Sequence, residues 1–519
     1  MSKTKIITAA EAAAEVKDGM TITVSGFVGS VCPESLSKAL EKRYLDTGSP
    51  KALTLYYCSA QGNRDGSGAE HFAHGGLLRK VIGGHWNLTP KLGQMARNNE
   101  IEAYALPQGT LSQLTRAIAG GRPGVITHVG LDTFVDPRLG GGKLNAITKD
   151  ELVHVIGVRG KEQLLYESLP IDIGFLRGTY ADERGNVTLE REPMTYEATS
   201  LAQAVKNSGG KVFVQVEKIA RAGGLDPRLV KIPGIYVDGV VEATPGDHEQ
   251  CFGFPFNPAL TGEIQAPLER PAPLPLDAKK IIARRAALEL RPGAVCNLGI
   301  GAPEYIALVA AEEGLDADFT LTVEAGVIGG SPLGGARFGA CANPECILSQ
   351  PEQFDFYDGG GLDQAFLGLA EVDEAGNLNV SRFGPRIAGP GGFINITQNA
   401  KNVYFCGTFT AGGLELTAAG GKLSVTHEGQ IKKFVRQVEQ ITFSGRHAQK
   451  TGQPVMYITE RAVFALSPAG MVLTEIAPGI DLGTQVLDLM DFSPIISPTL
   501  KTMDAEIFRE RPTRGATRQ

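Results

Sequence analysis

The sequence predicts an α/β protein made of two homologous domains, each with a mostly parallel sheet flanked by helices. Short β-prone runs alternate with segments of helical periodicity, which is typical of parallel strands joined by crossover helices. The alternation stops at a proline-rich stretch and then begins again. Residues 175–189 and 366–380 share six identical residues without a gap, which indicates an internal duplication of a whole domain.

The first half shows the alternation most clearly. Residues 6–19 have helical periodicity, with Thr8 as a possible N-cap, and a strand at 21–25 follows. A glycine turn leads to a second helix that begins at Pro33 and Glu34. The other elements expected here are strands at 53–58, 124–129, 152–156, 171–176 and 211–216 and helices at 110–119 and 198–206.

Four prolines among residues 266–276 interrupt the pattern and predict a semi-rigid linker. We therefore expect an N-terminal domain over residues 1–265, a linker over 266–277 and a C-terminal domain over 278–519. The C-terminal part opens with a helix at 281–293 and a strand after it, as the first half does.

Composition narrows the class of protein. A chain of 519 residues exceeds the size of a single core, and 42% hydrophobic residues are enough to fill two. The 50 Lys and Arg against 57 Asp and Glu give a net charge of −7, so no nucleic-acid partner is expected. Seven cysteines without a CxxC pair predict neither a disulfide framework nor a zinc site, and they fit a reducing cytoplasm.

The chain carries no pattern that predicts export or a membrane span. Glu11 and Glu15 interrupt the N-terminal segment before an apolar core can form, so no secretory signal is expected. No apolar run approaches the length of a membrane helix. We expect a cytoplasmic protein without a membrane partner.

Residues 319–323 form a short β-prone run that ends at Glu324, and three glycines follow within six residues. This pattern predicts a strand that presents Glu324 at its carboxyl end, where open α/β sheets bind ligands. Glu324 is the candidate nucleophile. The alternative is a glutamate that only accepts hydrogen bonds from a glycine turn.

The duplication makes the two halves chemically unequal. Aligning the strand at 53–58 with residues 319–324 places Cys58 opposite Glu324. We therefore expect one reactive site per chain, on the second half. A similar alignment pairs residues 130–136 with 389–395, of which the second segment is rich in glycine.

The sequence does not match several familiar binding motifs. The segment 137–144 lacks the first glycine and the Ser/Thr of a phosphate loop, and the segments from Gly299 and Gly389 lack the third glycine of a dinucleotide fingerprint. No metal site is expected at Cys341 and Cys346, nor at His71 and His74, because further ligands are missing. A solvated tail, with a contact to an anionic ligand or a neighbouring subunit as the alternative, is expected for Arg509, Arg511, Arg514 and Arg518.

Four segments together resemble the family I coenzyme A transferases, and more narrowly the fused-subunit bacterial acetate/propionate CoA-transferases. They are residues 323–330, 297–304, 359–363 and 389–393. The resemblance covers nearly the whole chain. It implies two α/β domains of the CoA-transferase type, derived from fused α and β subunits, and a homotetramer or homodimer.

The resemblance also implies a reaction. CoA would pass reversibly between a short-chain acyl-CoA and a free carboxylic acid, in ping-pong fashion. The glutamate matching Glu324 would form an acyl-glutamyl anhydride and then a γ-glutamyl-CoA thioester. CoA would thus be a substrate held transiently as a thioester, with no tightly bound cofactor and no metal.

The remaining site residues follow from the same resemblance. Backbone N–H groups of Gly389, Gly391 and Gly392 are suited to stabilise the oxyanion, as is the side chain of Gln108. The alternative for Gln108 is a turn residue beside Gly109. Contacts to CoA are expected from Gly299, Gly301, Gly359, Gly360 and Gly361.

Two other functions stay open from the sequence. Attack of water on the glutamyl thioester would make the protein an acyl-CoA hydrolase. A related fold could also serve as a non-catalytic ligand-binding protein, although such a protein has no need of Glu324. The preferred acid is not readable, because small acids differ by groups that pocket contacts separate by only about 1–3 kcal/mol.

Overall fold

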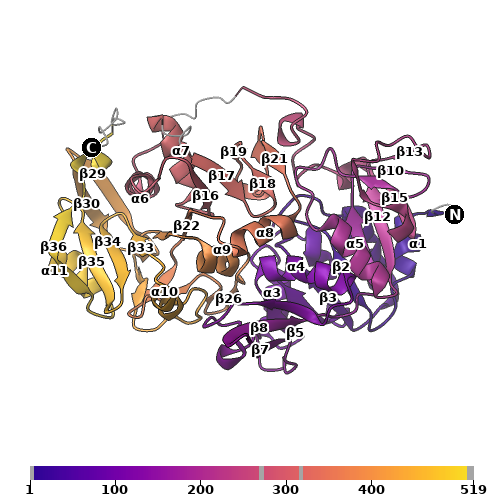
Figure 1. Ribbon diagram of the computed structural model, residues 1–519, viewed down its shortest axis with the longest axis horizontal. Helices are drawn as coiled ribbons and strands as arrows, with labels where there is room; N and C mark the ends of the chain where they lie inside the picture. The colour runs from indigo at the N-terminus through magenta and orange to yellow at the C-terminus, as the bar shows by residue number, and fades with distance from the viewer. Residues whose placement is uncertain (1–4, 268–273, 315–318, 511–519) are drawn as a thin grey trace. The chain divides into compact units, whose positions relative to one another are not determined.

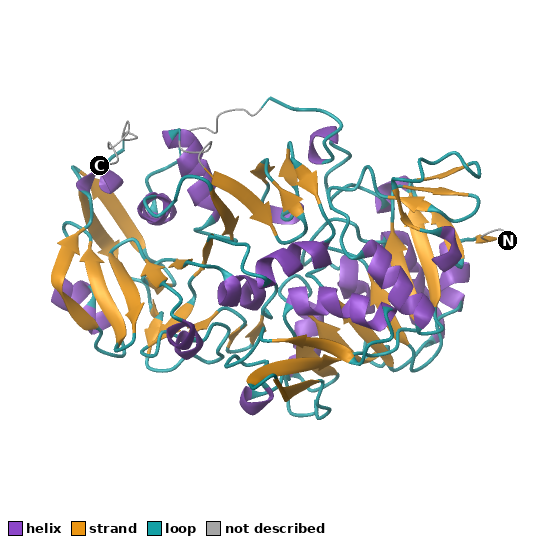
Figure 2. Ribbon diagram, in the orientation of Figure 1, coloured by secondary structure: helices purple, strands orange, loops and turns teal. Residues whose placement is uncertain are grey.

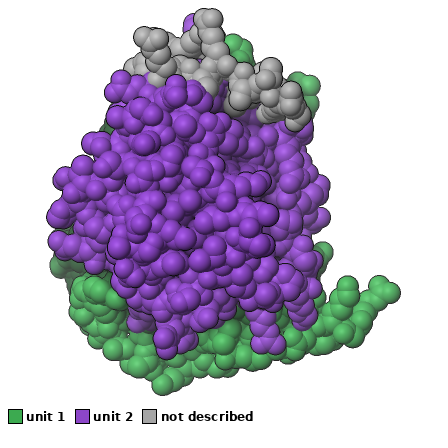
Figure 3. All heavy atoms as spheres, turned by 90° about the vertical axis from the view of Figure 1, so that its left-hand side faces the viewer, with its two compact units in different colours: residues 1–266, 323–355, 383–395 green, residues 267–322, 356–382, 396–519 purple. Residues whose placement is uncertain are grey.

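The computed structural model describes residues 5–267, 274–314 and 319–510. Residues 268–273 of the expected linker lie outside this range, as do Arg511, Arg514 and Arg518 of the expected tail. The chain forms two compact units, which Figure 3 colours separately. Unit 1 comprises residues 1–266, 323–355 and 383–395, and unit 2 comprises residues 267–322, 356–382 and 396–519. Two segments from the second half of the sequence, one of them beginning just before Glu324, therefore belong to unit 1.

The main sheet of unit 1 has eight strands, and each neighbouring pair is parallel (Figures 1 and 2). The order is β1-β15-β12-β9-β2-β3-β4-β5, so the direction of winding reverses between β2 and β9. Ligands of open α/β sheets bind at the carboxyl ends of strands beside such a reversal. The strands are β1 (Lys5–Ile6), β2 (Thr21–Val24), β3 (Leu53–Tyr57), β4 (Leu78–Gly83), β5 (Glu102–Ala105), β9 (Ile173–Arg177), β12 (Lys211–Val216) and β15 (Gly239–Glu242).

The helices of unit 1 begin close to where the sequence places them. In α1 (Ala9–Ala14), the Thr8 hydroxyl accepts the N–H of Glu11, and the Glu11 carboxylate accepts the N–H of Thr8. This confirms Thr8 as the N-cap, although the helix ends before the predicted Gly19. The other helices are α2 (Glu34–Thr47), α3 (Pro90–Arg97), α4 (Gln108–Ala119) and α5 (Ala198–Asn207).

Two predicted strands lie in a different kind of sheet. β6 (Gly124–Thr127) and β7 (Val153–Val158) both pair antiparallel with β8 (Lys161–Glu167), outside the parallel sheet. A tight turn at Arg159 and Gly160, both with positive φ, folds β8 back on β7. The strands exist as expected, but their assignment to the parallel alternation was wrong.

Unit 2 also contains a run of parallel strands, which continues into antiparallel strands. The strands β17, β16, β22, β27 and β33 are neighbours in that order and run parallel, whereas β33, β34 and β35 are antiparallel. The strands are β16 (Ala294–Leu298), β17 (Phe319–Val323), β22 (Gln364–Gly368), β27 (Val403–Cys406), β33 (Val455–Ile458), β34 (Ala462–Ser467), β35 (Gly470–Ile476) and β36 (Ile495–Thr502). The helices include α6 (Ala278–Ala287), α7 (Glu304–Glu313), α10 (Gly445–Thr451) and α11 (Leu482–Gln485).

The duplication is visible in one turn that both units contain. Asp182 accepts the side-chain amide of Asn186 at 3.0 Å and two backbone N–H groups at 2.9 and 3.0 Å. In unit 2, Asp373 accepts the side-chain amide of Asn377 at 3.1 Å and two N–H groups at 3.1 and 3.0 Å. The shared Asp, Gly and Asn of the 15-residue match are therefore the residues that build the same turn twice.

The alignment of residues 130–136 with 389–395 was wrong. The second segment leads into α9 (Phe393–Asn399), which lies in the chain between β22 and β27. The corresponding helix of unit 1 is α5, between β9 and β12. The counterpart of the glycine-rich segment is therefore the stretch before α5, and glycine content alone misled the comparison.

Candidate active site

Glu324 directly follows β17 at the start of a turn that requires glycine. Its neighbours Val323 and Ala325 are buried in the core of unit 1, while Glu324 itself is half-buried. Gly326 has φ +110°, and a Cβ there would collide with the Leu348 carbonyl. The backbone therefore holds Glu324 rigidly at the end of the strand, which confirms the strand and the glycine turn predicted around it.

Neither Cys341 nor Cys58 competes with Glu324 as a nucleophile. Burial, and then the Glu324 carboxylate, raise the pKa of Cys341 to about 12. Cys58 follows β3 as Glu324 follows β17, and burial together with Glu197 raises the pKa of its thiol well above the ordinary value. Both thiols are protonated at neutral pH, and a thiol is far less nucleophilic than its thiolate.

Gln108 is the first residue of α4, and its backbone is fixed to the glycine-rich loop of residues 389–392. The Gln108 N–H donates to the Gly391 carbonyl at 2.9 Å, and the Gly109 N–H donates to Oδ1 of Asn395 at 3.1 Å. The side-chain Nε2 of Gln108 is buried and has no acceptor among the described residues. A buried donor without a partner costs about 1–3 kcal/mol, so a ligand oxygen that accepts from it would be stabilised.

The glycine-rich loop is itself locked against the segment after β4. The Gly391 N–H donates to the Gly84 carbonyl at 2.8 Å, and the Trp86 N–H donates to the Ala388 carbonyl at 2.7 Å. Gly391 thus holds the loop in place, and its N–H is not available for an oxyanion. The N–H groups of Gly389 and Gly392 have no acceptor in the part of the chain that the structure describes.

His85 lies beside this loop and was missed by the sequence reasoning. A Cβ on Gly391 would stand 3.5 Å from Cδ2 of His85 and 3.8 Å from Oε1 of Gln108. Burial, and then the charges of Arg64 and Arg386, lower the pKa of His85 to about 4, so the ring is neutral at pH 7. The one available signal was a pair of glycines, Gly83 and Gly84, before a histidine, but it follows a strand that the sequence reading did not identify.

The glycines expected to contact CoA lie in unit 2, at opposite ends of its parallel strands. Gly299 and Gly301 follow β16, at the carboxyl ends of the parallel strands and beside the reversal between β16 and β22. Gly359, Gly360 and Gly361 precede β22 and so lie at the amino ends of the parallel strands. The Gly360 N–H donates to the Tyr357 carbonyl and the Gly361 N–H donates to the Phe356 carbonyl. These bonds terminate α8 (Gln350–Asp358), which explains the two glycines without a ligand.

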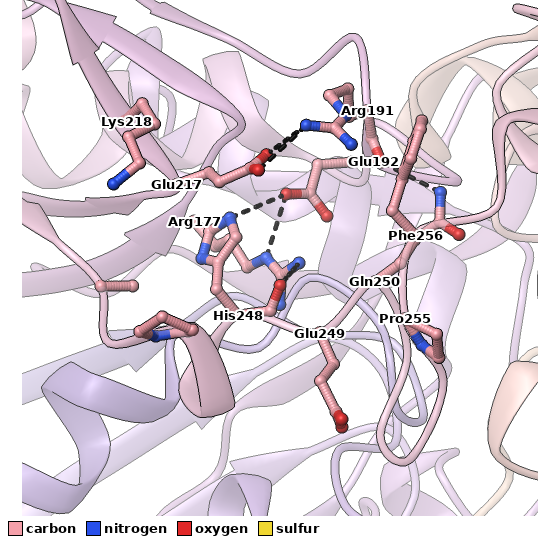
Figure 4. A pocket seen from close by; sticks show the side chains of 12 residues that line it. Arg177, Arg191, Glu192, Glu217, Lys218, His248, Glu249, Gln250, Pro255 and Phe256 are labelled. Carbon is pink, nitrogen blue, oxygen red and sulfur yellow. Dashed lines mark hydrogen bonds and ion pairs between the residues drawn. The ribbon is translucent and has the colours of Figure 1, made fainter.

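None of the predicted site residues lines the pocket of about 360 Å³ in unit 1 that Figure 4 shows. The pocket lies beyond the carboxyl ends of β9, β12 and β15. Its charges are compensated inside the protein: Arg177 Nε contacts Glu192 at 3.0 Å, and Arg191 contacts Glu217 at 2.9 Å.

His71 and His74 lie together beside two glutamates. Glu41 accepts from both rings, at 2.6 Å from His71 Nδ1 and 2.7 Å from His74 Nε2, and His71 Nε2 lies 3.0 Å from Glu34. Over residues 5–267, 274–314 and 319–510 the structure holds no group of three or more His, Cys, Asp or Glu side chains suited to a metal ion. Within the same ranges no helix is long and apolar enough to cross a membrane.

Sequence comparisons relate the chain to proteins of known activity. Residues 6–243 match the family described as Coenzyme A transferase. The acetate CoA-transferase YdiF of Escherichia coli K12 is 44% identical over 504 residues, which cover 97% of this chain and 95% of the relative. The caffeate CoA-transferase of Acetobacterium woodii is 45% identical over 515 residues, 98% of each chain.

A solved structure agrees with these relatives. The crystal structure of the acyl-CoA transferase YdiF from Escherichia coli O157:H7, a thioester complex with CoA, superposes with a TM-score of 0.94 at 43% identity. The match covers 99% of this chain and 98% of that one. It confirms the predicted α/β architecture with mostly parallel sheets flanked by helices.

Proposed function

The chain belongs to the coenzyme A transferase family and is a CoA-transferase, and on that premise we propose that it exchanges CoA between short-chain acyl-CoA and a free acid of the acetate or propionate type through Glu324. This membership excludes the non-catalytic ligand-binding protein that the sequence left open. The relatives act on acetate and on caffeate, as their names state. A small aliphatic acid is the proposal that the sequence resemblance favours.

The proposed reaction has two covalent stages. A carboxylate oxygen of Glu324 attacks the thioester carbonyl, the C–S bond breaks, and an acyl-glutamyl anhydride and a CoA thiolate form. The thiolate then attacks the glutamyl carbonyl, the C–O bond of the anhydride breaks, and the first acid leaves as its carboxylate. The second acid reverses these steps on the γ-glutamyl-CoA thioester, and no proton is transferred.

The observation that carries the proposal is the unpaired Nε2 of Gln108 beside the glycine loop. Each tetrahedral intermediate bears an oxyanion, and a fixed donor aimed at it contributes about 3 kcal/mol. We assign Nε2 of Gln108 and the N–H of Gly392 as donors, with Gly389 as a further candidate. The rigid backbone contact between Gln108 and Gly391 supports this assignment, because a preorganised donor needs no rearrangement during the reaction.

The proposed contacts to CoA lie in unit 2. Gly299 and Gly301 remain the proposed contacts to CoA, since they lie at a carboxyl edge beside a reversal of strand order. Gly301 has φ +96° and open space where a Cβ would be, so its backbone is accessible to a ligand. The segment 359–361 ends α8 at the amino ends of the strands and is not assigned as a CoA contact.

Further proposals rest on the resemblance. We propose a homotetramer or homodimer, a cytoplasmic location, and an origin of residues 1–265 and 278–519 in two fused subunits. All seven cysteines lie in the described ranges and none is in a disulfide, which supports a reducing compartment.

The test compares Glu324→Gln and Glu324→Ala with the wild type in an exchange assay between acetyl-CoA and propionate. Both variants should lose exchange while keeping the wild-type melting temperature and affinity for CoA. A Glu324→Ala protein that still exchanges CoA rules the role out. If added propionate fails to accelerate loss of acetyl-CoA in the wild type, the enzyme is a hydrolase.

A further inference from the structure

The pocket of Figure 4 contains two buried polar side chains that the proposed reaction does not use. Its volume of about 360 Å³ is within the range of small-molecule sites. The side chains of Glu192 and His248, which line it, are 2% and 6% exposed. Oε2 of Glu192 and Nε2 of His248 have no hydrogen-bond partner among the described residues. Buried polar atoms without a partner cost free energy, so a ligand that pairs with both would be stabilised.

The hydrogen bonds of Gln215 determine which ring nitrogen of His248 carries the proton. Gln215 Oε1 accepts the Ser35 N–H at 2.8 Å, and Nε2 of the same amide donates to the Asp247 carbonyl at 2.8 Å. Gln215 Nε2 also lies 3.1 Å from His248 Nδ1, which is therefore an acceptor. Burial lowers the pKa of His248 to about 2, so the ring is neutral at pH 7. His248 thus presents one N–H donor, at Nε2.

Glu192 presents the complementary acceptor. Its Oε1 accepts from Arg177 Nε at 3.0 Å and lies 3.6 Å from His248 Nε2. In Figure 4 the dashed lines to the Glu192 carboxylate both end on this one oxygen. Burial raises the pKa of Glu192, but the direct ion pair with Arg177 favours the ionised carboxylate, whose Oε2 can only accept. The free donor of His248 therefore lies next to the carboxylate that carries the free acceptor.

The charges of the pocket do not favour an anionic ligand. Each cationic residue of the lining is paired with a glutamate: Arg177 with Glu192, Arg191 with Glu217, and Lys218 with Glu242. An anion would also bring a second negative charge to Glu192 without a proton to donate. Apolar parts of the wall come from Ala243, Pro245, Pro255 and Phe256. A neutral ligand with a flat apolar ring therefore fits this pocket.

We propose that this pocket of unit 1 binds a small aromatic primary carboxamide, at a site separate from the residues assigned to CoA exchange. A primary carboxamide carries an acceptor and a donor on neighbouring atoms. Its carbonyl oxygen accepts from His248 Nε2, its NH₂ group donates to Glu192 Oε2, and its ring lies against the apolar wall. An ester lacks the donor, and an ionised carboxylate lacks it as well, so neither pairs with both groups.

Calorimetry with benzamide and methyl benzoate tests this pairing, because the two molecules share the ring and the carbonyl but only benzamide has N–H groups. The measurement is made at pH 8 to keep Glu192 ionised. Benzamide should bind with a Kd of about 1 mM or tighter. Methyl benzoate should bind at least about tenfold more weakly, since it loses a hydrogen bond to a charged group. Absence of benzamide binding, or equal binding of the two molecules, overturns the inference.

Variants test whether the binding occurs in this pocket. Ala243→Leu enlarges a lining side chain without touching the polar groups and should weaken benzamide binding at least about tenfold. Ala222→Leu is the matched control, because Ala222 is an exposed alanine of the same unit outside the lining. Both variants should keep the wild-type melting temperature, and His248→Phe should abolish the preference for benzamide over methyl benzoate. Benzamide binding that Ala243→Leu leaves unchanged, or that acetyl-CoA displaces, overturns the inference.

Discussion

The N–H of Gln108 donates to the carbonyl of Gly391 over 2.9 Å, so the start of α4 and the glycine loop before α9 are held together. This bond fixes the position of the Gln108 side chain, whose Nε2 is buried without an acceptor among the described residues. Gln108 and Gly391 come from opposite halves of the sequence. The fold thus assembles the proposed oxyanion site from two distant segments of one compact unit.

Removing the Gln108 amide should slow the chemical step. Gln108→Ala deletes one proposed oxyanion donor, and we expect kcat to fall roughly a hundredfold with little change in the KM for acetyl-CoA. Gln113→Ala is the control on the same helix, because Gln113 donates to Asp355 near the surface. A Gln108→Ala enzyme with the wild-type kcat would remove this residue from the mechanism.

Gly389→Ala should damage both activity and stability. Gly389 has φ +73°, and a Cβ there would stand 3.0 Å from the Gly84 carbonyl and from the Trp86 ring. We expect a lower melting temperature, with a cost of about 1–2 kcal/mol from the backbone alone, and loss of most exchange activity. Gly93→Ala, within α3 and with open space around its Cβ, should be neutral or slightly stabilising. Equal melting temperatures for the two variants would contradict the predicted strain.

Stability should fall as the pH rises above 6.5, the usual pKa of histidine, because of His71. Burial opposes its charge, but Glu34 and Glu41 outweigh burial and raise the pKa of His71 above its usual 6.5. A raised pKa contributes stability that is complete below the unfolded value and is lost as the pH rises through the folded value. The melting temperature of the wild type should therefore decrease through that range, and that of His71→Gln should change less. The exposed His427→Gln is the control, and an unchanged slope in His71→Gln would disprove the assignment.

Alkylating reagents should distinguish the cysteines. Cys346 is exposed, while the other six cysteines are buried. A maleimide should modify Cys346 in the native protein within minutes and leave Cys58 and Cys341 unmodified, since burial raises the pKa of both thiols. Peptide mass spectrometry after a short exposure measures this. Comparable labelling of Cys58 or Cys341 would mean that the region around the site opens in solution.

The sequence predicted those parts of the molecule that depend on local patterns. The cap at Thr8 and the strand before Glu324 each rest on a few adjacent residues, and the structure contains both. The match of residues 175–189 with 366–380 was also visible in the sequence, and the structure adds that its shared Asp and Asn build the same turn twice. The family and its enzymatic class were also predicted, through motifs that lie along nearly the whole chain, and the comparisons confirm them.

The features of the site that the sequence did not predict depend on contacts between distant segments. His85 has no motif of its own, and it becomes notable only because the fold sets it beside Gly391. The pairing of residues 130–136 with 389–395 failed because glycines recur wherever a chain turns. The segment 359–361 looked like a ligand loop, yet its position before a strand puts it at the amino edge of the sheet.

The most direct test of the central claim is to trap the covalent intermediate. The protein is incubated with acetyl-CoA, treated with borohydride or with hydroxylamine, and analysed by peptide mass spectrometry. We predict inactivation that requires acetyl-CoA and a modification on the peptide that contains Glu324, absent in Glu324→Gln. Modification of a cysteine such as Cys58, or no modification with full exchange activity, would contradict the account.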